Sequence, residues 1–269
     1  MAGKARYHGV MNAASLVAPL GPDCGLVTLP GADGWMQGRT LYGGASALVA
    51  YVAAMRALPD LPPLRSGQVA FVGPVGGEVE PVVTMVRQGR NVTQVRVDLL
   101  DAAGSVGLAA FFLFGAARPA NADYPAPTLN PLPALPDEDV LADRGPEFIR
   151  HNFELRRAQD QRGRGGAPVI RRWLRLKHAS GLDPMAELVL LGDTLPPGSV
   201  RAMQRPGPIS SINWHFNVLD PAPATTDGWW LAETAGEYGA DGFSSERLRM
   251  WNRDGRLVMS GMQCVALFG

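Results

Sequence analysis

The chain has little that suits a secreted, membrane-spanning or nucleic-acid-binding protein. Its 269 residues include two cysteines, Cys24 and Cys264, too few for a disulfide framework and without the spacing of a zinc site. Lysine plus arginine and aspartate plus glutamate balance at 25 each, so no net charge attracts nucleic acid or an acidic membrane. The most apolar stretch, 106–117, is too short to span a bilayer, and the first residues contain no apolar signal core. We therefore expect a cytoplasmic protein with no nucleic-acid or membrane partner.

Common catalytic signatures are also missing. The sequence has no HExxH, EF-hand, Walker A or dinucleotide-binding motif, and Ser46 lacks the closing glycine of a GxSxG turn. The four histidines stand singly, at His8, His151, His178 and His215, and the last of them lies in a predicted strand. We therefore expect no metal, no cofactor and no nucleophilic serine.

What the sequence does contain is one pattern twice. Hydrophobic residues make up 46% of the chain and charged residues 19%, which predicts a globular protein with one large or two ordinary cores. The hairpin glycines Gly104 and Gly255 are 151 residues apart, and the turn glycines Gly89 and Gly239 are 150 apart. This near-constant offset predicts two fused copies of one helix-plus-sheet unit, joined edge to edge, with the binding site at their seam.

Each half contains one apolar helix. Residues 44–58 are dense in alanine, leucine and methionine and end before Pro59, and their surface is apolar nearly all round, so a curled sheet must cover them. The second helix runs from about Pro184 to Asp193. Stretches rich in Val, Phe, Thr and Trp predict strands at 68–72, 79–87, 91–100 and 105–115, and at 170–176, 209–218, 229–238, 244–251 and 257–268.

Recurrent prolines separate the two halves. They lie between residues 116 and 136 and indicate a connecting segment. We divide the α+β chain into an N-terminal unit, 1–118, a Pro/Gly-rich linker, 119–168, and a C-terminal unit, 169–269.

Polar residues within apolar elements are the candidates for chemistry. Asp193 ends a run of apolar residues, where an unpaired carboxylate would cost several kcal/mol to bury. Gln263 lies in the most apolar strand of the second unit, and alternation places Ser211, Asn213 and His215 on one face of theirs. Two alternatives stay open, namely that Asp193 faces solvent and that Gln263 is satisfied at a sheet edge.

Five of these features, in this order, resemble the acyl-CoA thioesterase II-like double hotdog family. The resemblance covers about residues 20–118 and 169–269 and implies two fused, helix-wrapped antiparallel sheets and an acyl-CoA substrate. The features are the Tyr42-Gly43-Gly44 helix start, the paired units, Asp193, the Ser210-Ser211-Ile212 strand start and Gln263.

The resemblance also implies roles for single residues. In that family an aspartate, a threonine or serine, and a glutamine hold the attacking water, which corresponds to Asp193, Ser211 and Gln263. A register anchored on His215 instead puts Asn213 at a downstream polar position, so the choice among Ser210, Ser211 and Asn213 for the third group stays open. Such proteins often associate further, and we expect a homo-oligomer.

Elementary chemistry is consistent with these roles. An oriented water partly deprotonated by Asp193 can attack a thioester carbon without a covalent enzyme intermediate. The free N–H groups after Gly43 and Gly44 are suited to bind the oxyanion, although the pair could also be only a tight turn. We expect the acyl tail along the buried helix, and arginines could meet the phosphates of coenzyme A, at Arg87, Arg90 and Arg96.

Two other functions remain open. A hotdog hydratase or dehydratase pairs a histidine with an acid near the helix, and the helix from Gly44 contains no histidine. A non-catalytic acyl-CoA-binding or lipid-binding module would be favoured if Asp193 faced solvent.

Overall fold

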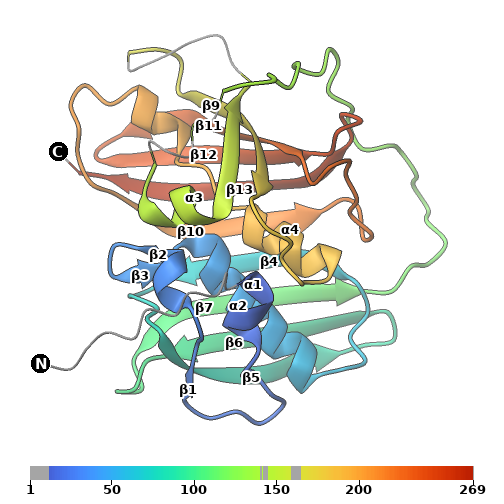
Figure 1. The fold of residues 1–269 in the computed structure, drawn as a ribbon. Helices are drawn as coiled ribbons and strands as arrows, with labels where there is room; N and C mark the ends of the chain where they lie inside the picture. The colour runs from blue at the N-terminus through green and yellow to red at the C-terminus, as the bar shows by residue number, and fades with distance from the viewer. Residues whose placement is uncertain (1–11, 140, 142–144, 159–164, 269) are drawn as a thin grey trace, which may run out of the picture.

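A computed structural model describes residues 12–139, 141, 145–158 and 165–268. It contains one antiparallel sheet of eleven strands that runs through both halves (Figure 1). In spatial order, the N-terminal half contributes β1 (Val27–Thr28), β5 (Glu78–Gln88), β6 (Val92–Leu100), β7 (Val106–Gly115) and β4 (Leu64–Phe71). The C-terminal half continues with β10 (Ile209–Val218), β13 (Leu257–Leu267), β12 (Phe243–Trp251), β11 (Trp230–Ala240), β9 (Val169–Leu176) and β8 (Phe153–Arg157).

Each half wraps its sheet around one helix, as predicted. Helix α2 (Gly43–Ala57) is apolar all round and buried from Gly44 to Ala54. Helix α4 (Pro184–Leu191) begins with a proline in its first turn, and the Asp183 side chain caps it by accepting from the N–H groups of Met185 and Ala186. The two helices pack against each other beneath the sheet, where both lie in the same hydrophobic core.

The halves join edge to edge through β4 and β10. Their backbones pair in antiparallel register from Ala70 opposite Asn213 to Ser66 opposite Asn217. Ser66 also donates to the carbonyl of Phe216 at 2.9 Å, so a side chain reinforces the ladder. This continuous sheet confirms the expected double hotdog arrangement.

The range predicted as a linker contains regular structure. Helix α3 (Glu147–Asn152) and strand β8 both lie in it, and β8 extends the sheet beyond β9. Upstream of α3, the carbonyl of Ala134 accepts a hydrogen bond from the indole N–H of Trp173 at 3.2 Å. Three leucines of the proline-rich segment pack on a second small core around Trp173, at Leu129, Leu132 and Leu135.

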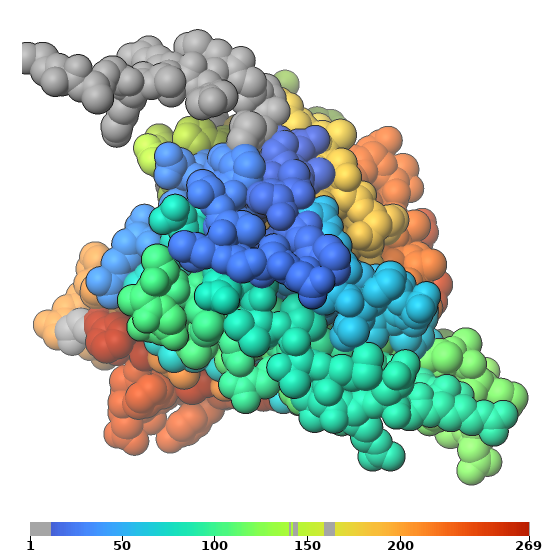
Figure 2. All heavy atoms as spheres, turned by 90° about the horizontal axis from the view of Figure 1, so that it is seen from below, coloured from blue at the N-terminus to red at the C-terminus, as the bar shows by residue number. Residues whose placement is uncertain are grey.

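Short elements cover the open side of α2. Helix α1 (Ala13–Val17) leads into a loop whose Leu20 carbonyl accepts from Arg56 at 2.6 Å. Figure 2 shows this N-terminal segment, in dark blue, spread over that face of the molecule. The remaining short elements are η1 (Ala32–Trp35), β2 (Met36–Gln37), β3 (Thr40–Leu41) and η3 (Gly198–Arg201). No helix in the described part of the chain is long and apolar enough to cross a membrane.

Candidate active site

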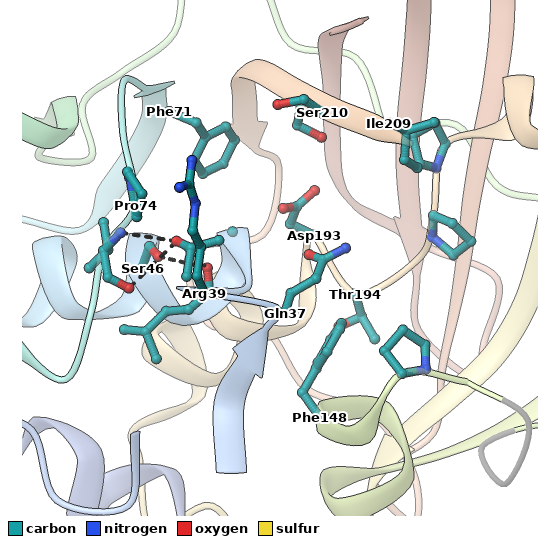
Figure 3. A pocket seen from close by; sticks show the side chains of 18 of the residues that line it. Gln37, Arg39, Ser46, Phe71, Pro74, Phe148, Asp193, Thr194, Ile209 and Ser210 are labelled. Carbon is teal, nitrogen blue, oxygen red and sulfur yellow. Dashed lines mark hydrogen bonds between the residues drawn. The ribbon is translucent and has the colours of Figure 1, made fainter. Parts of the chain in front are cut away.

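A cavity of about 480 Å³ opens at the seam, and both halves contribute to its wall (Figure 3). The N-terminal half contributes the β2–β3 hairpin, the start of α2 and the segment after β4. The C-terminal half contributes α3, the segment after α4 and the start of β10. The lining residues are Gln37, Arg39, Thr40, Leu41, Gly43, Ser46, 71–75, Pro146, Phe148, Ile149, 193–197 and 209–211.

Asp193 and Gln263 meet at this cavity. Asp193 follows the end of α4, and the Gln263 amide Nε2 donates to its Oδ1. Gln263 is itself buried, on the face of β13 that packs toward the helices. Asp193 therefore has a protein partner and a cavity-facing position, which argues against the alternative that it looks into bulk solvent.

Burial changes the acidity of Asp193. Removal of the carboxyl group from water raises its pKa from 3.8 to about 7, although the hydrogen bond from Gln263 acts in the opposite direction. The residue keeps partial exposure, toward the cavity. A carboxylate with a pKa near neutrality is well matched to accept a proton from water.

The raised pKa also predicts a pH-dependent stability cost. Since the unfolded carboxyl titrates near 3.8, the native state binds more protons than the unfolded state up to about pH 7, and the free energy of unfolding falls as pH rises through this window. Asp193→Asn removes the ionisation and keeps an oxygen for Gln263. We expect its melting temperature to exceed that of the wild type at about pH 8 and the difference to shrink at about pH 4, as measured by calorimetry. Equal melting temperatures at both pH values would contradict burial of this charge.

The start of α2 packs directly on Asp193 and on the end of α4. A Cβ at Gly43 would collide with Asp193 Oδ2 and lie 2.7 Å from Cζ of Phe71. At Gly44 it would collide with the carbonyl oxygen of Leu190, which also accepts from the Tyr42 hydroxyl at 2.7 Å. Only glycine fits at these two positions, and their N–H groups, in the first helical turn, have no acceptor within the helix.

A β-bulge decides which polar residues of β10 reach the cavity. The pairing of β10 with β13 shifts between Ser211 and Asn213, so Ser211 stands opposite Val265 on the inner face. Ser211 lines the cavity together with Ser210, which Figure 3 shows near Asp193. The expectation that Ser211 shares a face with Asn213 and His215 is therefore wrong, because the bulge inserts a residue between them.

Asn213 is used elsewhere. Its side chain is exposed, and its Oδ1 accepts from the backbone N–H of Cys264 at 2.9 Å. It is not among the residues that line the cavity. The structure thus brings together Asp193, Gln263, Gly43 and the two serines, and it leaves Asn213 on the opposite face of the sheet.

Other residues named from the sequence lie away from the cavity. His151, His178 and His215 are exposed and do not line it, and His8 lies outside the described residues. Arg96 pairs with Asp98 at 2.9 Å on the outer face, while the β5–β6 hairpin carries Arg87 and Arg90. Within the described ranges, histidines, cysteines and acidic residues form no group of three that could hold a metal.

Sequence reasoning missed part of the wall. Phe148 of α3 stacks on Tyr42 with ring centroids 4.6 Å apart, and Ile149 and Thr194 line the same cavity. The sequence signal for this wall is the apolar pair Phe148 and Ile149, which stands between the charged residues Glu147 and Arg150. The stacking partner that places Phe148 in the wall, Tyr42, is distant in sequence, so the local pattern alone indicates only a short surface segment.

Comparison with known proteins relates both halves to one family. A family model described as the acyl-CoA thioesterase C-terminal domain matches residues 126–267, and its N-terminal counterpart matches 32–115. The curated proteins that were compared contain no match.

Three solved structures share the fold. A protein from Thermobifida fusca, provisionally described as a thioesterase II, superposes with a TM-score of 0.77 at 20% identity, covering 96% of this chain and 98% of that one. A hot dog protein of unknown function from Alicyclobacillus acidocaldarius gives 0.76 at 21%, covering 96% and 99%. An acyl-CoA thioesterase II from Mycobacterium marinum gives 0.65 at 18%, covering 84% and 89%. At these identities the superpositions establish the double hotdog fold alone.

Proposed function

The chain belongs to the acyl-CoA thioesterase family, and on this premise we propose that it hydrolyses an acyl-CoA thioester to a free acid and coenzyme A. One observation carries the proposal. A carboxyl group with a pKa of about 7, that of Asp193, lines a cavity together with Gly43, whose N–H group, in the first turn of α2, has no acceptor within the helix. A general base and oxyanion donors are the two groups that direct attack of water on a thioester requires.

The reaction proceeds in two balanced steps. Asp193 accepts a proton from a water molecule while the water oxygen forms a bond to the thioester carbon. The carbonyl oxygen becomes an oxyanion, which accepts from the N–H group of Gly43 near the positive end of the helix dipole. Gly44, also expected as a donor, is buried against the Leu190 carbonyl and does not line the cavity. The intermediate then collapses and the C–S bond breaks. Asp193 transfers its proton to the departing sulfur, so coenzyme A leaves as the thiol and the free acid remains.

Gln263 and Ser211 act on the base and the water. The Gln263 amide holds the carboxylate in place and favours its charged form, since its hydrogen bond lowers the pKa of Asp193. The Ser211 hydroxyl lines the same cavity from the inner face of β10, where it can orient the water.

Ser211→Ala and Asn213→Ala form a matched pair on one strand. We expect Ser211→Ala to lower kcat about tenfold or more, because the water loses an orienting partner, and Asn213→Ala to leave kcat near the wild-type value. Initial rates of thiol release at saturating acyl-CoA measure both. A large loss at Asn213 with none at Ser211 would reverse the assignment.

The acyl group lies against the C-terminal wall of the cavity in this proposal. Only Gly43 and Ser46 of α2 line the cavity, and its residues from 47 to 54 are buried by the sheet, α1 and α4, so the helix offers no channel for a tail. An apolar wall stands nearby instead, formed by Phe148, Ile149, Leu195, Pro196, Pro197 and Ile209.

A panel of acyl-CoA thioesters tests the proposal directly. We expect release of free coenzyme A, detected with a thiol-reactive dye, that depends on acyl-group size. Binding of acyl-CoA without release of thiol would instead support a non-catalytic acyl-CoA-binding protein.

A hotdog hydratase or dehydratase is disfavoured, because no histidine is among the described residues that line the cavity. The two unpaired cysteines support a cytoplasmic location, and exposed apolar side chains such as Tyr238 and Phe243 support a homo-oligomer.

A further inference from the structure

Arg39 is the one cationic residue among the described residues that line the cavity, and Asp193 is the one anionic residue. The arginine is exposed on the hairpin between β2 and β3. Within the described part of the chain it forms no hydrogen bond and no ion pair, so its guanidinium donors are free for a ligand.

The hairpin that carries Arg39 is firmly attached to the cavity wall. Leu41 donates its backbone N–H to the carbonyl of Val75 at 2.8 Å, and the N–H of Val75 donates to the Thr40 hydroxyl at 3.0 Å. Tyr42 donates to the carbonyl of Trp35 at 3.0 Å. These bonds fix the backbone on the C-terminal side of Arg39, so a ligand would have only the arginine side chain itself to order.

Arg39 borders two cavities, and an anion is favoured in the seam cavity because fewer acidic residues line it. Figure 3 shows the Arg39 side chain on the same side of the cavity as Phe71 and Pro74, across from Ile209. Within the described part of the chain, Arg39 and Asp193 form no ion pair, so the arginine is available to an anion bound in the cavity. Arg39 also borders a second cavity of about 570 Å³, but acidic residues line that one, at Asp33, Glu78 and Asp101.

We infer that Arg39 binds an anionic group of the substrate, either a phosphate of coenzyme A or a carboxylate on the acyl group. The planar guanidinium can form two parallel hydrogen bonds to either group. The identity of the substrate rests on the proposed function, whereas the anion-binding role of Arg39 does not require hydrolysis. Arg39 is thereby a specificity residue of the seam cavity.

Three thioesters separate the two sources of the anion. A neutral acyl-CoA contains the phosphates, the same acyl group on N-acetylcysteamine contains no anion, and an ω-carboxyacyl thioester of N-acetylcysteamine contains only the carboxylate. Each is tested with the wild type, Arg39→Gln and Arg118→Gln. Arg118 is the matched control, because it is exposed in the segment after β7 and lines neither cavity.

Arg39→Gln is expected to lower kcat/KM about tenfold or more for at least one anionic thioester, to leave the neutral one unchanged, and to differ from Arg118→Gln. Loss with the acyl-CoA assigns a phosphate, and loss with the ω-carboxyacyl thioester assigns a carboxylate. Equal values for the two variants on both anionic thioesters, or an equal loss on the neutral one, would overturn the inference. If the wild type hydrolyses none of them, the proposed function fails, and dissociation constants from calorimetry with the same ligands and variants test Arg39 by the same criteria.

Discussion

Replacement of Asp193 by asparagine is expected to lower kcat for thioester hydrolysis on the order of 10² to 10⁴-fold and to leave the dissociation constant for acyl-CoA nearly unchanged. The side chains have the same shape, and asparagine keeps an oxygen to accept from Gln263. What disappears is the group that takes the proton from water. Single-turnover rates and binding titrations with the same acyl-CoA measure the two effects separately.

The pH dependence of the rate identifies the base. Since the pKa of Asp193 is about 7, the wild-type rate should rise with pH through about 7 and then level off, and the residual rate of Asp193→Asn should lack this step. Gln263→Ala is the companion variant. Loss of its hydrogen bond raises the pKa of Asp193 further, so the step should move to higher pH. A step that persists in Asp193→Asn would mean that another group is the base.

Gly43→Ala should have the second largest effect, because one methyl group would meet two site residues. Its Cβ would collide with Asp193 Oδ2 and lie 2.7 Å from Cζ of Phe71. Relief of this overlap must displace the base or the start of α2, and overpacking of this kind typically costs about 1–3 kcal/mol of unfolding free energy. We expect kcat to fall on the order of 10²-fold or more, since misplacement of catalytic groups by about 1 Å can cost this much.

Gly34→Ala is the matched control for this substitution. A Cβ at Gly34 meets no atom within 4 Å, so the variant should keep the wild-type kcat and stability. Steady-state kinetics and denaturant unfolding of both variants check the prediction. Wild-type kinetics in Gly43→Ala would contradict the packing of Asp193 against the start of α2.

The architecture followed from the sequence because the pattern occurs twice. The hairpin glycines Gly104 and Gly255, 151 residues apart, both lie in turns with positive φ, and the all-apolar surface of α2 requires a sheet around it. The prediction that Gly239 is a turn glycine was wrong, because it pairs with Ser244 inside β11 and the following turn contains Gly242. Asp193 and Gln263 were predictable as site residues because a carboxylate and an amide within apolar segments need polar partners. In the structure the two side chains hydrogen-bond to each other. Element ends were less predictable, and β4 begins at Leu64, before the predicted 68.

The remaining features depend on contacts that no local pattern contains. The bulge between Ser211 and Asn213 comes from the register with β13, and strict alternation along β10 therefore gave the wrong faces. Helix α3 lies in a proline-rich range, and its role in the wall comes from the stacking of Phe148 on Tyr42, over 100 residues away in sequence. Arg39 is one of 23 arginines, and only the cavity distinguishes it from the others.

The central claim is that Asp193 activates a water molecule for direct attack on an acyl thioester. A single turnover with excess enzyme in oxygen-18-labelled water tests it most directly, with the free acid analysed by mass spectrometry. Direct attack predicts that the first acid released contains one labelled oxygen and that the Asp193 carboxylate stays unlabelled. An unlabelled acid, with the label in Asp193, would mean that the carboxylate itself attacks the thioester, and this result would contradict the account.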